Sequence, residues 1–316
     1  MLSRDCCSNP PKLDPHCGLG TVVDDIAGLR TYTAGSPTSH RAILLVTDIY
    51  GYQAPNLRNI ADEAAAAGFF VVAPDFYYGD PYVDGEPWDD WSRRHGTVKG
   101  AEDAKAVVAA LRRGGATSIG AAGFCWGGKV VVELAKSDGI DAAVLLHPAM
   151  VTVDDIKEVE VPMEVLGGEL DEISPPSLLK QFELILSTKS GIESFVKVFP
   201  GVPHGFSIRY DANDKFAVKT AEEAQQDMLN WFQKYVRWSY LPRGQKQVFT
   251  AAVKWSKEWA KVNSTAKMGD SYIITMEDHL KMMEAKMDAK MKRMEMRWFC
   301  FLCAALCISL VIAFLH

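Results

Sequence analysis

SIGAAGFCWGGKVVVELAKS, residues 118–137, is the stretch that decides the fold. An apolar run that ends at Phe124 is followed at once by a turn flanked by glycines, and a segment with helical periodicity begins at Trp126. A strand, a sharp turn and a helix in succession place the side chain at the turn, Cys125, at the N-terminus of the helix. The stretch therefore predicts a nucleophile elbow of the form G-x-C-x-G, with cysteine where G-x-S-x-G has serine.

The same alternation of strand and helix continues outward on both sides of this stretch. The predicted strands span residues 42–48, 69–75, 118–124, 142–147, 161–168 and 193–201, and the predicted helices span residues 55–68, 98–115, 126–137, 176–189 and 214–238. Near-continuous apolar strands that alternate with helices indicate a doubly wound, mostly parallel sheet with helices on both faces, so the fold class is α/β. An antiparallel ribbon is expected before the sheet, over residues 20–35.

The turn at Cys125 has the features of a reactive site. The N–H of Trp126 can face a developing oxyanion, and the dipole of the following helix favours the thiolate form of Cys125. The alternative is a structural cysteine, because an unbridged cysteine is commonly a small buried hydrophobe. The strand-turn-helix setting favours the nucleophile.

An acid and a histidine follow the cysteine in the order that an elbow requires. Asp171, in LGGELDEISPP, comes directly after the strand at 161–168, and His204, in FPGVPHGF, comes directly after the strand at 193–201. Loops at the carboxyl ends of parallel strands lie at one edge of the sheet, so these residues are expected to meet Cys125. His147 ends a different strand, and it is expected to line the pocket or to be structural.

These motifs resemble the dienelactone hydrolase family, the carboxymethylenebutenolidases of the α/β-hydrolase fold. The resemblance rests on GFCWGGK around Cys125, on D-x-x-x-P from Asp171, on HGF at His204 and on residues 44–81. It covers roughly residues 20–238, and the opening CCSNPP, residues 6–11, is also similar to plant members of the family.

The resemblance implies a role for each residue of a catalytic triad. Cys125 would be the nucleophile, His204 the base and Asp171 the acid that orients it. The backbone N–H groups of Ile49 and Trp126 would form the oxyanion hole.

Further residues match the family's pattern less completely. Asp48 stands where bacterial members have a glutamate that contacts the resting thiol and gates its activation, and Arg209 matches an arginine of the eukaryotic pattern that could hold a substrate carboxylate. Bacterial members have a second arginine where this chain has Gly79. The loop at residues 77–96 is expected to cover the pocket. Its candidate walls are Tyr77, Trp88 and Trp91, for which ordinary lid packing is the alternative.

These residues together imply a hydrolase that cleaves an activated ester, lactone or thioester through an acyl-thioester intermediate. Neither a cofactor nor a metal site is predicted. The principal alternative is a non-catalytic, tail-anchored α/β-hydrolase that binds a small molecule or a partner. A remote alternative is a glycan hydrolase, which would need a carboxylate pair such as Asp48 and Asp171.

Charge and cysteine content bound the environment of the chain. The net charge is −6, and residues 242–297 hold 12 basic and 7 acidic residues, so the acidic excess lies before them and argues against a nucleic-acid partner. The seven cysteines form no disulfide framework, as expected of a cytosolic protein. The first residues contain no apolar run of the kind that a secretory signal requires.

The C-terminal part predicts a membrane anchor. Residues 298–316 contain no Asp, Glu, Lys or Arg, and a helix of that length spans roughly 28 Å, about one bilayer core. Basic residues lie just before it, which predicts a cytosolic catalytic domain on an intracellular membrane, with the organelle left open. Apolar residues, many of them Met, form a stripe over residues 276–294 that is interpreted first as a stalk and otherwise as a weak self-pairing or partner-binding helix.

Four segments follow from this organisation. They are an N-terminal extension at 1–19, an α/β-hydrolase domain at 20–240, a charged Met-rich helical linker at 241–297 and a transmembrane tail anchor at 298–316.

Overall fold

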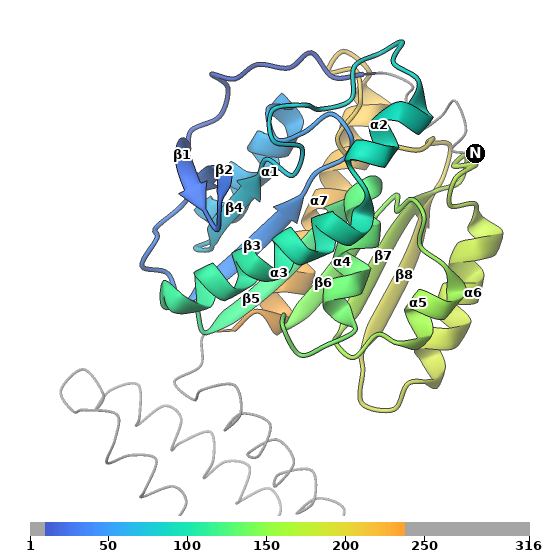
Figure 1. The fold of residues 1–316 in the computed structure, drawn as a ribbon. Helices are drawn as coiled ribbons and strands as arrows, with labels where there is room; N and C mark the ends of the chain where they lie inside the picture. Colours follow the sequence, from blue (N-terminus) through green and yellow to red (C-terminus); the bar gives the residue numbers. More distant parts are fainter. Residues whose placement is uncertain (1–9, 238–316) are drawn as a thin grey trace, which may run out of the picture. The chain divides into compact units, whose positions relative to one another are not determined.

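The computed structural model describes residues 10–237, which form a twisted sheet covered by helices (Figure 1). They belong to the first of two units into which the chain divides, Met1–Pro242 and Arg243–His316. The strands are β1 (Thr21–Ile26), β2 (Leu29–Ala34), β3 (Arg41–Val46), β4 (Phe70–Pro74), β5 (Ser118–Phe124), β6 (Ala142–Leu146), β7 (Met163–Gly168) and β8 (Ser194–Phe199). The helices are α1 (Pro55–Ala66), α2 (Trp88–Arg94), α3 (Thr97–Arg113), α4 (Trp126–Ala135), α5 (Val153–Lys157), α6 (Pro176–Thr188) and α7 (Lys215–Tyr235).

The strand order within the described part is β1-β2-β4-β3-β5-β6-β7-β8. β2 pairs antiparallel with β1 and with β4, and all pairs from β4 onward are parallel. The predicted ribbon and the mostly parallel sheet are therefore confirmed. β4 lies on one side of β3 and β5 on the other, so the order reverses at β3. Such a reversal is where ligand sites form in open α/β sheets.

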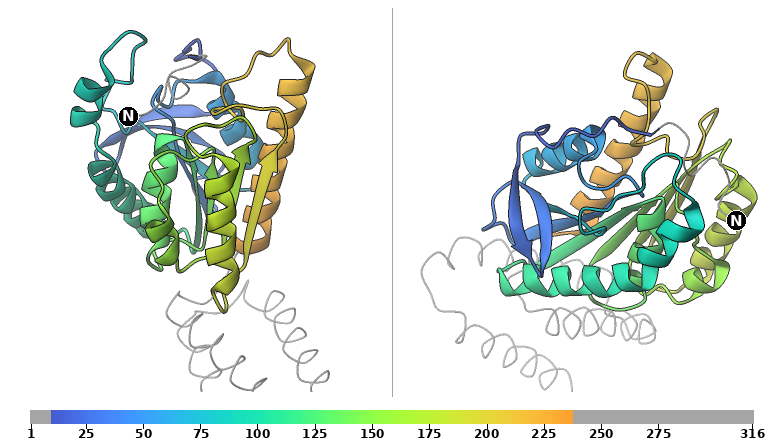
Figure 2. Two further views of the ribbon diagram at one scale, coloured as in Figure 1. Left: turned by 90° about the vertical axis from the view of Figure 1, so that its right-hand side faces the viewer. Right: turned by 45° about the horizontal axis from the view of Figure 1, so that its top comes forward.

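The sheet separates two apolar cores, because successive side chains of a strand point to opposite faces. Leu44 and Val46 pack into one core together with side chains of α3, α4, α5 and α6, whereas Ile43 and Leu45 pack into the other with side chains of α1 and α7. Figure 2 shows the two groups of helices on either side of the strands. Every residue from 42 to 46 is fully buried, which explains why this strand reads as a continuous apolar run.

The strands and helices predicted between residues 20 and 238 form, with boundaries that shift by a few residues at most. Two short helices, α2 and α5, arise in segments predicted as loops. α5 is closed at its start by a capping box in which Thr152 and Asp155 bond each other's backbone N–H groups. At five and seven residues these helices are too short for hydrophobic periodicity to reveal them.

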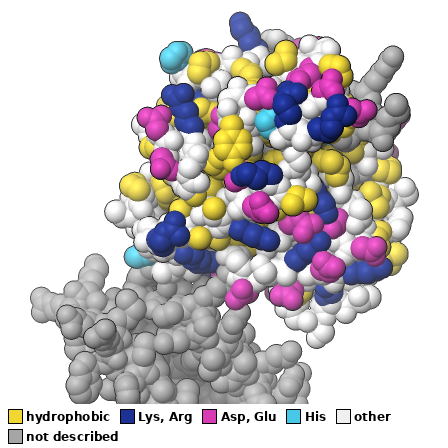
Figure 3. Space-filling view, viewed as in Figure 1, with side chains coloured by type: hydrophobic (Ala, Val, Ile, Leu, Met, Phe, Trp, Pro, Cys, Tyr) yellow, Lys and Arg dark blue, Asp and Glu magenta, His cyan; other side chains and the backbone are white. Residues whose placement is uncertain are grey.

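Acidic and basic side chains are interspersed on the surface in front of α3 and α4 (Figure 3). Many form local ion pairs, such as that of Arg94 with Glu86 at 2.6 Å and that of Lys157 with Asp154 at 2.7 Å. Exposed pairs of this kind contribute at most about 1 kcal/mol each, so the fold depends on its two cores.

No helix between residues 10 and 237 is long and apolar enough to span a membrane. The N-terminal residues 1–9, the linker, the Met-rich stripe at 276–294 and the predicted anchor at 298–316 lie outside the described residues.

Candidate active site

The turn between β5 and α4 has the geometry of the predicted elbow. Cys125 adopts φ +52° and ψ −112°, a conformation that is costly for a residue with a side chain. A Cβ on Gly123 would lie 2.2 Å from the Gly127 carbonyl oxygen, and a Cβ on Gly127 would lie 2.1 Å from the Val46 carbonyl oxygen. Both glycines of the motif are therefore required by close backbone contact, and they fix Cys125 at the start of α4.

The loop after β8 brings His204 to the acid that follows β7. Nδ1 of His204 lies 2.8 Å from Oδ2 of Asp171, and neither side chain is exposed to solvent. The other carboxylate oxygen accepts the N–H groups of Ile173 and Ser174 at 2.8 and 3.0 Å. The acid is thus held on both oxygens, and it fixes the ring of His204 with Nε2 directed away from it.

Cys125 acts on His204 from the opposite side of the ring. Burial lowers the pKa of His204, but the Cys125 sulfur and the Asp171 carboxylate outweigh it and raise that pKa to about 9. Cys125 raises this pKa first through its charge and then through a hydrogen bond with the His204 side chain. Catalytic hydrogen bonds are often long before substrate binds. The structure brings the three predicted triad residues together.

Asp48, at the end of β3, lies beside the same sulfur. Its Oδ1 accepts the N–H of Tyr50 at 3.0 Å, and its Oδ2 lies 3.3 Å from Nε of Arg209. Burial raises the pKa of Asp48 to about 6, and the charge of Cys125 adds to this rise while Arg209 opposes it. The side chains of Asp48 and Arg209 are each only 1% exposed, so Arg209 faces the carboxylate of the protein and does not reach solvent here.

The two predicted oxyanion donors come from adjacent strands. β3 and β5 run side by side up to the pair Val46 and Gly123, so Ile49 and Trp126 follow at the same edge of the sheet. Both residues are buried, and within the described residues neither N–H donates to a backbone carbonyl. Buried N–H groups are rarely left without an acceptor, so this pair is a place where a ligand oxygen would be stabilised.

A family model for the dienelactone hydrolase family matches residues 29–236, from the start of β2 to just beyond α7. The chain belongs to the dienelactone hydrolase family. In this hydrolase, Cys125 at the elbow, His204 and Asp171 occupy the positions that the family resemblance implies for a triad.

Individual relatives agree with this membership. The hydrolase is 44% identical over 186 residues to a Zea mays protein named endo-1,3;1,4-beta-D-glucanase, in a match that covers 57% of this chain and 61% of the maize protein's length. It is 32% identical over 232 residues to the Mus musculus carboxymethylenebutenolidase homolog, covering 69% of this chain and 92% of the mouse protein. The solved structure of a dienelactone hydrolase-like promiscuous phosphotriesterase from metagenomic libraries has a TM-score of 0.56 at 16% identity, covering 69% of this chain and 98% of that one. This last likeness shows the α/β-hydrolase fold alone.

The loop of the hydrolase at residues 77–96 places its aromatic side chains over the elbow. Trp91 on α2 is fully buried, with its ring 5.0 Å from that of Tyr77 and 5.4 Å from that of the half-buried Trp88. Tyr77 also lies 5.1 Å from Trp126. These contacts are lid packing in the present conformation. Cys125 is 0% exposed beneath them, so substrate reaches the sulfur only after part of the hydrolase moves.

His147, which follows β6, is buried beside the triad. Its Nε2 lies 2.9 Å from the hydroxyl oxygen of Ser207, and its ring packs edge-on against that of His204 at 5.1 Å. Burial holds the pKa of His147 well below the usual histidine value, and the charges of His204 and Arg209 lower it further. A neutral ring in this place can support His204 without taking its proton.

Several contacts near the triad of the hydrolase could not be predicted from the sequence. Ser207 beneath His147, and the hydroxyls of Thr47 and Tyr77 on the Asp48 carbonyl, have no motif that signals them. The position of Ser207 three residues after His204 was the one available sign, because both lie in the same turn.

Proposed function

We propose that this member of the dienelactone hydrolase family, a carboxylic ester hydrolase, cleaves an activated ester, lactone or thioester with Cys125 as nucleophile. The observation that carries the proposal is that His204 contacts the Asp171 carboxylate and also interacts with the Cys125 sulfur at the elbow. The raised pKa of His204 favours the pair of imidazolium and thiolate, which contains the reactive form of a cysteine, whereas the charge on Asp48 opposes it.

In the first half of the reaction the Cys125 sulfur attacks the carbonyl carbon. A C–S bond forms, and the π electrons move to the oxygen, which the N–H groups of Ile49 and Trp126 stabilise. The intermediate then expels the alcohol oxygen, which takes a proton from the His204 imidazolium. The products of this step are an acyl-thioester and a neutral histidine.

In the second half His204 takes a proton from water as the water oxygen attacks the thioester. The second tetrahedral intermediate expels the Cys125 thiolate, and His204 remains protonated. A carboxylic acid leaves, and the resting ion pair is restored. Asp171 stabilises the imidazolium in both halves through its hydrogen bond to Nδ1.

Cysteine restricts the substrate to activated acyl groups. A thiolate is a good leaving group, so it returns from the tetrahedral intermediate unless the departing oxygen or sulfur is comparably good. Esters of acidic alcohols, enol lactones and thioesters satisfy that condition, whereas amides do not. The buried positive charge of Arg209 favours a substrate that carries a carboxylate, provided that the pair with Asp48 rearranges when the substrate enters.

The name of the maize relative raises glucan hydrolysis as a second function. Glycoside hydrolysis needs two carboxyl groups that flank a sugar. The nearest acids here are each engaged, Asp48 with Arg209 and Asp171 with His204, and each residue is at most 2% exposed. We therefore rank ester cleavage first and retain the glucan as a substrate for the test.

The test measures hydrolysis of p-nitrophenyl acetate, a dienelactone and a mixed-linkage β-glucan by the full chain. We expect turnover of the first two, and loss of at least about 1,000-fold in Cys125→Ala. Turnover of the esters that persists in Cys125→Ala would refute the assignment. Rapid labelling of Cys125 by iodoacetamide near neutral pH separates an active site from a non-catalytic binding protein, in which the thiol would react slowly.

We also propose that residues 298–316 anchor the hydrolase to an intracellular membrane with its catalytic domain in the cytosol. The uncharged segment and the basic residues before it support this proposal. Alkaline carbonate extraction of cell membranes tests it. The full-length protein should remain in the pellet, and release into the supernatant would exclude a spanning helix.

A further inference from the structure

The carbonyl oxygen of Asp48 accepts an unusual number of hydrogen bonds. Tyr77 donates its hydroxyl to this oxygen at 2.9 Å, the N–H of Gly51 donates at 3.2 Å, and the hydroxyl of Thr47 donates as well. The carbonyl shares its planar, trans peptide group with the N–H of Ile49, which points in the opposite direction. Whatever fixes the carbonyl therefore also fixes the direction of this oxyanion donor.

The side chain of Tyr77 is held so that its hydroxyl stays on the carbonyl. It is 0% exposed, and its ring contacts those of Trp91, His95 and Trp126 at 5.0, 5.4 and 5.1 Å. The indole N–H of Trp126 in turn donates to the His95 carbonyl at 3.1 Å. Tyr77 thus packs on Trp126, one residue of the proposed oxyanion hole, and its hydroxyl bonds the peptide group that carries the N–H of Ile49, the other donor.

We propose that Tyr77 is a positioning residue of the oxyanion hole, which directs and polarises the Asp48–Ile49 peptide. A donor on the carbonyl oxygen draws electron density from the peptide nitrogen, and this makes the Ile49 N–H a stronger donor. The inference rests on the proposed function, because it assigns a role within acyl transfer.

The test compares Tyr77→Phe with the wild type in two reactions at Cys125. Ester hydrolysis develops an oxyanion, whereas alkylation by iodoacetamide displaces iodide at a saturated carbon and develops none. Loss of a whole oxyanion donor costs about 100- to 1,000-fold in kcat, so loss of a hydrogen bond that supports the donor should cost about 10-fold. We expect kcat for p-nitrophenyl acetate to fall by about that factor, with KM and the alkylation rate unchanged.

Tyr78→Phe is the matched control. The neighbouring Tyr78 is 56% exposed, and its hydroxyl contacts Asp103 and Lys99 on α3 at 2.7 and 2.6 Å. This variant should keep both rates. Equal loss of hydrolysis and alkylation in Tyr77→Phe would overturn the inference, because it would mean that the thiol itself was disturbed. Unchanged hydrolysis would overturn it as well.

A second measurement tests the role of Tyr77 without requiring that the chosen ester be hydrolysed. The Cys125 thiolate can add reversibly to a trifluoromethyl ketone, where a C–S bond forms and the carbonyl oxygen becomes an alkoxide that resembles the reaction intermediate. The inhibition or dissociation constant should rise by about 10-fold in Tyr77→Phe and in Thr47→Val, which removes another donor to the same carbonyl. Equal affinity in the wild type and both variants would refute the role of Tyr77, even if no ester turnover were found in any of them.

Discussion

Asp48 is a carboxylate in a place where negative charge is costly. It is buried beside the Cys125 sulfur, and its pKa rises to about 6 although Arg209 lies 3.3 Å away. Two negative groups that share one buried site oppose each other's ionisation. The charge on Asp48 therefore restrains the thiolate, which is what the proposed gating role requires.

The thiol of Cys125 should therefore react faster in Asp48→Asn than in the wild type. Removal of a negative charge about 4 Å away is worth roughly 1 kcal/mol even at the dielectric constant of water, a factor of about five, so this factor is a lower bound inside the protein. Alkylation by iodoacetamide at pH 7, above the Asp48 pKa of about 6, should be at least about fivefold faster than in the wild type. The difference should shrink below pH 5, where Asp48 is protonated.

The control for this variant is Asp24→Asn, since the Asp24 side chain is 94% exposed on β1 and should not affect the thiol. Alkylation that is slower in Asp48→Asn at every pH would show that Asp48 activates the cysteine.

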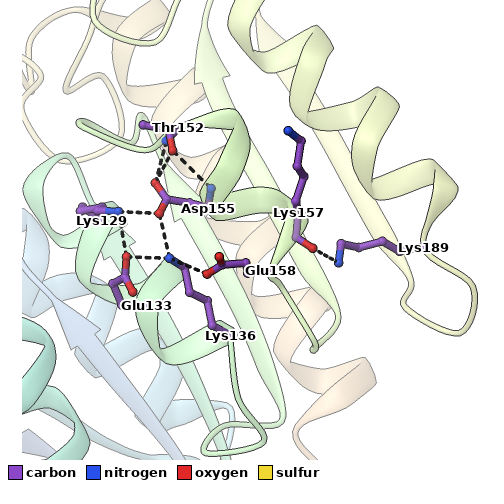
Figure 4. A network of polar contacts seen from close by, with 8 residues as sticks. All are labelled: Lys129, Glu133, Lys136, Thr152, Asp155, Lys157, Glu158 and Lys189. Carbon is purple, nitrogen blue, oxygen red and sulfur yellow. Dashed lines mark hydrogen bonds and ion pairs between the residues drawn. The ribbon is translucent and has the colours of Figure 1, made fainter.

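At the scale of elements, a cluster of ion pairs connects helix α4 to α5 (Figure 4). Helix α4 begins next to the proposed nucleophile. The Asp155 Oδ1 accepts the Nζ groups of Lys129 and Lys136 at 2.6 and 2.9 Å, and both lysines also contact Glu133. The Asp155 Oδ2 accepts the N–H and the hydroxyl of Thr152, each at 2.8 Å. One carboxylate thus both caps α5 and binds it to α4.

Asp155→Asn should destabilise the domain by about 2 kcal/mol at pH 7, from loss of part of the cap and of the charged contacts. Burial alone would raise the pKa of Asp155, but Lys129, Lys136 and Thr152 hold it well below its usual value. A lowered pKa means that the stabilisation is present above the unfolded-state pKa and is lost as the pH falls towards the folded-state value. Urea unfolding should show a wild-type advantage at pH 7 that narrows below pH 4.

The adjacent Asp154→Asn is the control for the cluster, because the Asp154 side chain is 84% exposed and pairs only with Lys157 among the salt bridges of the described residues. Equal unfolding free energies for the wild type and Asp155→Asn at pH 7 would contradict a stabilising role for the cluster.

At the scale of the whole molecule, the strands of the described sheet bury an acid, Glu164, that the proposed chemistry does not use. Glu164 is the second residue of β7, which lies between β6 and β8, and it is 2% exposed. Burial raises its pKa to about 8, and Asp227 adds to the rise while Lys197 opposes it. The fold therefore accommodates Glu164 most easily as the neutral acid.

A raised carboxyl pKa gives stability that is present below the unfolded-state value and is lost as the pH rises through the folded-state value. We expect the wild type to lose on the order of 5 kcal/mol at this site between about pH 4.5 and 8, because the pKa of Glu164 rises from 4.5 to about 8 and each unit corresponds to about 1.4 kcal/mol. Glu164→Gln should remove that loss, so the variant should be the more stable protein at pH 9 in urea unfolding. The exposed Glu183→Gln serves as the control, and a Glu164→Gln variant no more stable than the wild type at pH 9 would contradict the assignment.

The arrangement of the whole domain could largely be predicted because each strand carries its own signal. Residues 42–46 are buried on both faces and therefore form an apolar run, and the loops after β5, β7 and β8 necessarily meet at one edge. Cys125, Asp171 and His204 could be placed together for that reason.

Contacts between distant side chains could not be predicted in the same way. The sequence does not indicate that the Asp48 carboxylate lies 3.3 Å from Arg209, or that the hydroxyl of Tyr77 bonds a backbone carbonyl far from it in the chain. Neither contact leaves a periodic or spacing signal, because each depends on which side chains the packed loops bring together. Such contacts set the electrostatics of the site, which motifs alone do not describe.

The tight backbone contacts around the elbow also bear on how this chemistry can diverge. A Cβ at Gly123 or Gly127 would lie 2.2 or 2.1 Å from a backbone carbonyl oxygen, so neither position admits a side chain, whereas the turn already carries a side chain at Cys125. Mutation can therefore exchange sulfur for oxygen at the one variable position while leaving the surrounding scaffold intact. A cysteine hydrolase and a serine hydrolase of this architecture can therefore differ by one atom at this position. We expect substitution of Cys125 by serine to be tolerated more readily than substitution of either flanking glycine.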